Sequence, residues 1–120
     1  MKRLIYLALP CLLLAACSPT DPNEKLIQGK WMAAGDLGEG HSWYLEWTFN
    51  GGSFEMSGYP PIYQTGQYRV RASESDTITL ELYNQEGDLS TDDRAITIVI
   101  DSANDQLTID GQGPFSRTEE

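Results

Sequence analysis

The feature that most constrains the fold is an alternation of large apolar and polar side chains in residues 43–57. From Trp43 to Phe49 every second residue is large and apolar, whereas Glu46 and Thr48 are polar. Successive side chains of a β-strand point to opposite faces of the sheet, so this pattern gathers the rings on one face. The segment therefore predicts a strand that is buried on one side and solvated on the other.

A glycine-rich turn at residues 50–52 follows this strand, and the run 53–57 returns with the same alternation. Together they predict a β-hairpin. A loop made of residues 50 and 51 would place Trp47 opposite Phe54, whereas a loop made of residues 51 and 52 would place Phe49 opposite Phe54. Both registers match the apolar faces, so the buried face is predicted and the register stays open.

The rest of the chain repeats this alternation in short runs at roughly ten-residue spacing, and no stretch has a helical period. Short local connections favour an all-β, antiparallel, up-and-down meander of about eight strands. Closure of these strands into a small barrel would remove both edges of the sheet. The first strand is expected at residues 27–34, and loops are expected at residues 35–41, 58–62 and 85–93.

The side chains expected to point inward are numerous and bulky for such short strands. An eight-stranded barrel has an interior just wide enough for side chains or for one small ligand. Because packed interiors leave few voids, we expect this set to form a filled core, with a ligand cavity as the alternative. The set comprises Trp31, Trp43, Leu45, Trp47, Phe49, Phe54, Met56, Tyr68, Val70, Ile78, Leu80, Leu82, Ile96, Ile98, Ile100, Leu107, Ile109 and Phe115.

The first 16 residues have the pattern of a secretory signal. A basic start that contains Lys2 and Arg3 precedes a short apolar run at residues 4–14. This run is too short to span a membrane, which takes about 20 residues in a helix. Small residues and Cys17 follow it directly.

The sequence Leu14-Ala15-Ala16-Cys17 resembles the lipobox of bacterial lipoproteins. This resemblance implies cleavage before Cys17 and a diacylglyceryl group on its sulfur. It also implies a protein anchored in a membrane of the cell envelope, and Ser18 after the cysteine implies the outer membrane if the host is Gram-negative. Residues 17–25 are then the lipidated cysteine with a flexible, proline-containing tether, and residues 26–120 are one barrel domain.

Removal of the signal changes the composition of the mature chain. Cys11 leaves with the signal and Cys17 carries lipid, so the domain keeps no thiol for a disulfide. The formal net charge of −10 becomes −12, with six Lys and Arg against eighteen Asp and Glu. This acidity makes nucleic acid and anionic lipid surfaces poor partners.

Three residues give the domain a family resemblance. Gly29-Lys30-Trp31 opens the first expected strand, and Arg117 lies in the last. Together with the meander, these residues resemble the Gly-x-Trp signature of lipocalins and related calycin-like barrels. The resemblance implies that Trp31 closes one end of the barrel beneath Arg117, and that the barrel binds a small apolar ligand.

The residues for catalysis are few. His41 is the single histidine, the mature domain has no thiol, and the chain has no nucleophile elbow. The spacing of Asp36, Glu39 and His41 matches no established metal-ligand pattern. We therefore expect no catalytic residues, no metal site and no cofactor.

The segment 59–63 combines two tyrosines with two prolines, and such loops form protein contacts. Tyr59 and Tyr63, together with His41, are therefore expected on a binding rim formed by the longer loops. The primary hypothesis is a non-catalytic interaction or inhibitor-like module that binds an envelope protein. The alternative is a lipocalin-like binder of a small apolar ligand, and an enzyme is the third hypothesis.

Replacement of Cys17 by Ala tests the anchor. If Cys17 carries the lipid, the Cys17→Ala chain should no longer incorporate radiolabelled palmitate and should leave the membrane fraction. The domain should stay folded, because no predicted strand contains this residue. Unchanged labelling of the variant would contradict the lipoprotein assignment.

Overall fold

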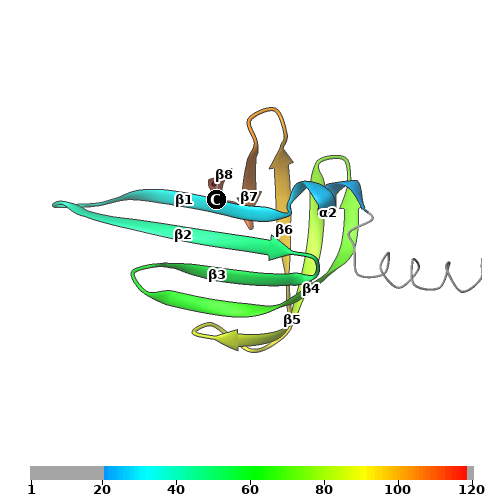
Figure 1. Cartoon of the computed structure of the whole chain (residues 1–120), viewed down its shortest axis with the longest axis horizontal. Coiled ribbons are helices and arrows are strands. Elements are labelled where there is room, and N and C mark those ends of the chain that lie inside the picture. Colours follow the sequence, from blue (N-terminus) through cyan, green and yellow to red (C-terminus); the bar gives the residue numbers. More distant parts are fainter. Residues whose placement is uncertain (1–20, 119–120) are drawn as a thin grey trace, which may run out of the picture.

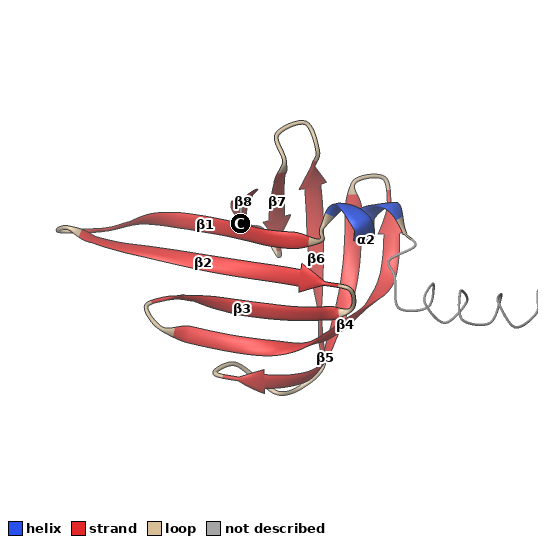
Figure 2. Cartoon of the chain, in the orientation of Figure 1, coloured by secondary structure: helices blue, strands red, loops and turns tan. Residues whose placement is uncertain are grey.

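The computed structural model describes residues 21–118, and the predicted signal 1–16 and the predicted anchor Cys17 lie outside this range. The described chain is almost entirely β-sheet, preceded by one short helix (Figures 1 and 2). The elements are α2 (Pro22–Leu26), β1 (Gly29–Gly38), β2 (His41–Asn50), β3 (Ser53–Tyr59), β4 (Ile62–Glu74), β5 (Thr77–Gly87), β6 (Arg94–Asp101), β7 (Gln106–Ile109) and β8 (Gln112–Arg117).

The eight strands form a closed barrel in the order in which they occur in the sequence. Each strand pairs antiparallel with the next, and β8 returns to pair with β1. The predicted all-β, up-and-down meander of eight strands is therefore confirmed. This architecture is consistent with a lipocalin-like fold.

The register of the β2–β3 hairpin follows the second of the two predicted alternatives. Gly51 and Gly52 form the turn, and Phe49 lies opposite Phe54. Both glycines have positive φ, 55° and 102°. A φ of 102° is rarely adopted by a residue with a side chain, so the second turn position, Gly52, suits glycine.

Two segments expected as loops are mostly strand. β1 begins at Gly29 rather than at residue 27, and it continues through 35–38, so only Glu39 and Gly40 separate it from β2. Likewise β3 and β4 extend to Tyr59 and from Ile62, which leaves two prolines as the turn. The glycines and prolines of these segments favour loops on local propensity alone. Hydrogen bonds from the neighbouring strands outweigh this propensity and extend the strands into the segments.

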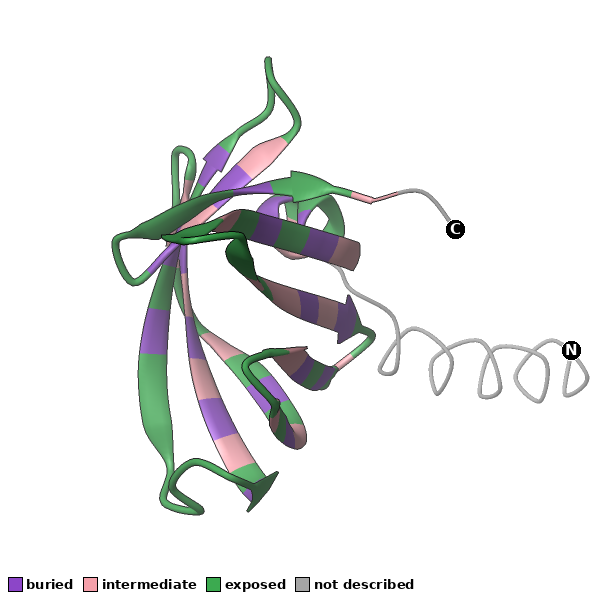
Figure 3. Ribbon diagram, turned by 90° about the vertical axis from the view of Figure 1, so that its left-hand side faces the viewer, coloured by how far each residue is buried: buried purple, intermediate pink, exposed green. Residues whose placement is uncertain are grey.

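Burial alternates along the strands as the sequence predicts (Figure 3). All residues of the predicted inward set are buried except Trp43, Leu45 and Val70, which are partly buried and pack against the core. Ile27 and Ala33 join the core. Trp43 and Leu45 belong to the half of β2 that runs toward the β1–β2 turn, where the barrel opens.

One end of the barrel is covered by α2, and we call it the closed end. The sequence predicts an extended tether as far as Lys25, but the chain turns into a helix at Pro22. The Asp21 side chain accepts a hydrogen bond from the Glu24 N–H at 3.1 Å and another from the Ser73 hydroxyl at 2.8 Å. An aspartate N-cap followed by proline in the first turn is a typical start of a helix. Five residues are too few to show a helical period of apolar side chains, so the sequence pattern does not predict this helix.

Buried and partly buried polar side chains fasten α2 to the turns at the closed end. The Asn23 amide donates to the Ser73 hydroxyl at 3.0 Å and to the Ser75 carbonyl at 3.1 Å. Gln28 donates to the Tyr68 hydroxyl at 2.8 Å and accepts from the Gly51 N–H at 2.7 Å. The helix therefore joins the β2–β3 and β4–β5 turns into one cap.

The barrel closes through a short seam between β1 and β8. Within residues 21–118, Trp31–Arg117 and Met32–Ser116 are the register pairs across it, and the Thr118 N–H donates to the Lys30 carbonyl at 2.9 Å. The Arg117 guanidinium lies 4.2 Å from the centre of the Trp31 ring, and it donates to the carbonyls of Gln28 at 2.7 Å and Leu26 at 3.0 Å. The Trp31 indole N–H donates to the Ile27 carbonyl at 2.8 Å.

Gly29 makes room for this arrangement. A Cβ atom at position 29 would lie 2.6 Å from Nη1 of Arg117, and the residue has a φ of +116°. The first residue of the Gly-x-Trp pattern is therefore required by the approach of the guanidinium as well as by the backbone. Asp105 completes the set, with both carboxylate oxygens 3.1 Å from Nε of Arg117.

Truncation of the seam residues tests this closure. Trp31→Ala should lower the free energy of unfolding by about 3–5 kcal/mol as a large-to-small core change, and Arg117→Ala should lower it by less. A double-mutant cycle, measured by urea denaturation, should give a coupling energy of about 0.5–2 kcal/mol. Zero coupling would contradict a closure that depends on this pair.

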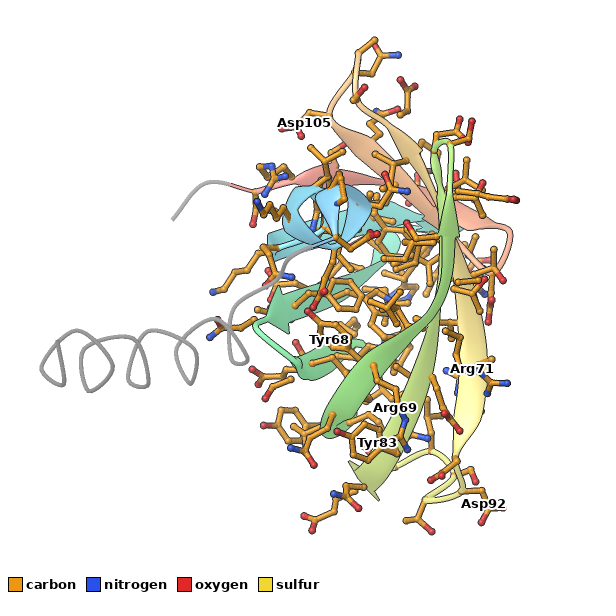
Figure 4. The ribbon with its side chains drawn as sticks, turned by 90° about the vertical axis from the view of Figure 1, so that its right-hand side faces the viewer. Tyr68, Arg69, Arg71, Tyr83, Asp92 and Asp105 are labelled. Atoms are coloured by element: carbon orange, nitrogen blue, oxygen red, sulfur yellow. The ribbon has the colours of Figure 1, made fainter. Side chains whose placement is uncertain are left out.

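Arg69→Ala provides the matched control. The Arg69 guanidinium lies 4.1 Å from the Tyr83 ring centre and 3.1 Å from a Glu81 oxygen, but on the exposed outer wall (Figure 4). Exposed pairs of this kind contribute at most about 1 kcal/mol. Its loss should therefore change the free energy of unfolding much less than the loss of Arg117.

Candidate functional site

The end of the barrel opposite α2 contains a cavity, and we call this end the mouth. Residues at or next to the turns after β3 and β7 and in the β5–β6 loop contribute to its lining, and the β1–β2 hairpin extends farthest from α2 (Figure 1). The mouth cavity has a volume of about 380 Å³. Its lining is Leu45, Trp47, Met56, Ile62, Leu89, Arg94, Ile109, Asp110 and Gln112.

A second depression of about 400 Å³, the apolar groove, continues from the mouth cavity along the β1–β2 hairpin. The two share Leu45 and Ile62. Pockets for small molecules commonly occupy about 300–1,000 Å³ and are mostly apolar. The groove is lined by Leu37, Trp43, Tyr44, Leu45, Tyr59, Pro60 and Ile62.

The side chains of the groove are positioned by close packing within the hairpin. Gly35 lies opposite Trp43, and a Cβ atom at position 35 would be only 2.4 Å from the Trp43 indole nitrogen. The indole can therefore lie flat across β1 only because residue 35 has no side chain. Leu37, which is 57% exposed, extends the apolar surface toward the tip of the hairpin.

Two buried glutamines hold the β5–β6 loop at the mouth. The Gln64 amide donates to the Ser90 carbonyl at 3.0 Å, and its oxygen accepts from the Leu89 N–H at 2.9 Å. Gln85 donates to the Asp92 carbonyl at 2.5 Å. These bonds place Leu89 in the wall of the mouth cavity, so the loop is anchored to the barrel rather than being only a solvated connection.

The rim of the mouth is acidic. Arg94, the only cation in the lining of the cavity, is already paired with Asp110 at 3.8 Å. Asp110 also accepts from the Thr97 N–H at 2.9 Å, which fixes its carboxylate. Further carboxylates at this end of the barrel are Asp36 on β1 and, in the connections, Glu39, Asp88, Asp92 and Asp93.

The structure brings one of the three predicted rim residues into the groove. Tyr59 lines it and is 55% exposed. Tyr63 lies on the outer wall, where a hydrogen bond with Glu55 raises the pKa of its hydroxyl. His41 begins β2 opposite Gly38, at the tip of the hairpin. Trp31 and Arg117 lie at the closed end.

Two other depressions are less suited to an apolar ligand. A hollow of about 490 Å³ on the outer wall has a mostly exposed polar lining, with Phe54 as its one buried side chain. A cavity of about 60 Å³ beside Trp31 and Arg117 holds no more than a few water molecules. The mouth and the groove therefore form the candidate site.

The described residues offer no constellation typical of a metal centre or a membrane helix. Within residues 21–118, no group of three or more His, Cys, Asp or Glu side chains is placed to hold a metal ion. No helix in this part of the chain is long and apolar enough to cross a membrane.

Comparisons with protein-family models, with curated proteins and with solved structures gave no match.

Several residues of the site had no motif to reveal them. Ile62 was expected in a loop, and Gln64 was assigned no role, although it lies in phase with the inward-pointing Tyr68. That phase is the signal that could have identified Gln64 as buried. Gln85 was expected in a loop, and only the length of β5 shows that it belongs to a strand.

Gln64→Leu tests the anchoring of the loop. The substitution nearly preserves the volume of the side chain but leaves the Ser90 carbonyl and the Leu89 N–H without their partner. We therefore expect the free energy of unfolding to fall by about 1–3 kcal/mol. Amide hydrogen exchange of residues 88–93 should accelerate. Gln67→Leu, at an exposed position of the same strand, should leave that exchange unchanged; equal effects of both variants would contradict the anchoring role.

Proposed function

We propose that this protein is a non-catalytic binding protein of the bacterial cell envelope, anchored through Cys17, and that its mouth binds a small apolar ligand. The observation that carries this proposal is the continuity of the mouth cavity with the apolar groove through Leu45 and Ile62. Together they offer one continuous surface that side chains of the core do not fill: the groove is almost entirely apolar, and the mouth cavity adds an apolar wall beside the polar Arg94, Asp110 and Gln112.

The position of this surface differs from a ligand site deep inside the barrel. The centre is occupied by buried rings such as Phe49, Phe54 and Tyr68, which pack at centroid distances of 5.7–5.8 Å with one another or with Trp47. A ligand would therefore lie at the mouth and along the groove. Each 100 Å² of apolar ligand surface buried there would contribute about 2.5 kcal/mol before the costs of association.

The orientation of the barrel supports access from solvent. Asp21, where the described chain begins, is hydrogen-bonded to Ser73 at the closed end. The segment that leads to Cys17 therefore starts from the end opposite the mouth. In the proposed arrangement the closed end faces the membrane and the mouth faces away from it.

A second candidate function is protein binding through the same end of the barrel. Leu37, Tyr44 and Tyr59 line the groove and are exposed to solvent. In addition, beyond Met32 no described strand pairs with the edge of β1 that faces away from β2. Exposed aromatic rings and an open strand edge are features that protein partners use, as the interaction-module hypothesis requires.

Native mass spectrometry of the protein isolated from its host separates the two functions. A co-purified small molecule would support ligand binding, whereas a stoichiometric protein complex without one would support the interaction module. Recovery of the bare chain alone, under conditions that preserve known lipocalin complexes, would count against the first proposal.

Substitutions in the shared wall test where binding occurs. Leu45→Asn and Ile62→Asn should each weaken binding of the neutral dye N-phenyl-1-naphthylamine about tenfold or more, because each places an amide in the apolar surface. Val99→Asn, at an exposed apolar position on the outer wall, should leave binding unchanged. Dye binding that responds only to Val99→Asn would place the site elsewhere.

A further inference from the structure

Trp47 presents a buried hydrogen-bond donor without an acceptor. Its side chain is 96% buried, and no atom of the described chain accepts a hydrogen bond from its indole nitrogen. By contrast, the Trp31 indole at the closed end donates to the Ile27 carbonyl at 2.8 Å. Buried donors in folded proteins almost always have partners, so this exception requires a physical explanation.

The location of Trp47 supplies the explanation. Its ring stacks on Phe49 at 5.7 Å and packs against Phe54 at 5.8 Å, and both of these residues lie nearer the β2–β3 turn at the closed end. On the other side Trp47 lines the mouth cavity. The unpartnered donor therefore belongs to the residue at which the filled core ends and the candidate ligand site begins.

We propose that the ligand of the mouth carries a neutral acceptor oxygen, as in a ketone, ester or amide, and that Trp47 Nε1 donates a hydrogen bond to it. This inference rests on the proposed ligand-binding function and adds the chemical class of the ligand. A ligand with such an oxygen satisfies the donor, whereas a pure hydrocarbon leaves it unpaired.

The charges around the mouth select a neutral acceptor over a carboxylate. Arg94 is paired with Asp110, whose carboxylate is itself fixed by the Thr97 N–H. The β5–β6 loop adds Asp88, Asp92 and Asp93 to the same rim. An anionic ligand would meet net negative charge without a free cation to compensate for its desolvation.

Met56 is the neighbour of Trp47 whose side chain can most readily change its position. It is the register partner of Trp47 on β3 and lines the same cavity. Its unbranched side chain has three rotatable bonds and fills irregular spaces. Trp47 Nε1 is buried in the free protein, so the proposed hydrogen bond requires a neighbouring side chain to shift, and Met56 is the neighbour that we expect to do so.

Three probes of similar shape test the inference. Benzophenone and diphenylmethane differ only in a carbonyl against a methylene, and diphenylacetate carries a carboxylate on a similar body. Binding is measured with the full chain carrying Cys17→Ala, so that neither lipid nor detergent competes. Benzophenone should bind up to about tenfold more tightly than diphenylmethane, as expected for one net hydrogen bond, and diphenylacetate should bind more weakly than benzophenone.

Nuclear magnetic resonance reports on the donor directly. The chain contains three tryptophans, so its ¹H–¹⁵N spectrum has three indole signals, and the Trp47 signal is identified by its loss in Trp47→Phe. Benzophenone should shift this signal downfield, and diphenylmethane should not. Trp47→Phe should abolish the preference for benzophenone over diphenylmethane, and Trp43→Phe should keep this preference.

The outcomes distinguish this inference from the proposed function. Equal binding of benzophenone and diphenylmethane, with the Trp47 signal unmoved, would overturn the inference and leave apolar ligand binding intact. Tighter binding of diphenylacetate than of benzophenone would overturn the requirement for a neutral acceptor. Binding of none of the probes to the Cys17→Ala chain with its barrel otherwise unchanged would overturn the inference and the proposed function together.

Discussion

The contact between Arg117 and Trp31 is the interaction on which the rest of the structure depends. In the part of the chain that the structure describes, β1 and β8 form two register pairs, and one more backbone hydrogen bond, from Thr118 to Lys30, crosses the seam, so the ladder alone holds it weakly. The guanidinium adds hydrogen bonds to two backbone carbonyls and covers the indole. Because β1 and β8 are the two ends of the meander, this side chain reinforces the closure of the sheet into a barrel with an enclosed core.

Closure divides the polar groups of the barrel between two different ends. At the closed end, Asn23, Gln28 and Trp31 all have hydrogen-bond partners, and α2 excludes solvent. At the mouth, Gln64 and Gln85 have partners, but Trp47 does not. Satisfied polar groups at one end provide rigidity, and the unsatisfied donor at the other marks the place where an additional molecule would stabilise the protein.

The fold could be predicted from the sequence because alternation is a local signal. Each apolar face, from Trp47 on β2 to Ile98 on β6, is encoded within a few neighbouring residues. The ends of the strands are harder to predict from the sequence, because residues 35–38 are held in β1 by pairing with β2 rather than by their own propensity. The candidate site was missed for the same reason: Ile62, Leu89 and Gln64 come together only after the strands have curled around a common axis.

The long β1–β2 hairpin has a consequence for molecules crowded on a surface. Beyond Met32, the edge of β1 that faces away from β2 pairs with no strand of the described chain. Continuation of the register would place Pro114, which has no N–H, opposite Ala34. An open edge of this kind invites two identical chains to join into a continuous sheet. The formal net charge, −10 for the full sequence and −12 for the expected mature chain, would oppose such an encounter through long-range repulsion that high salt weakens.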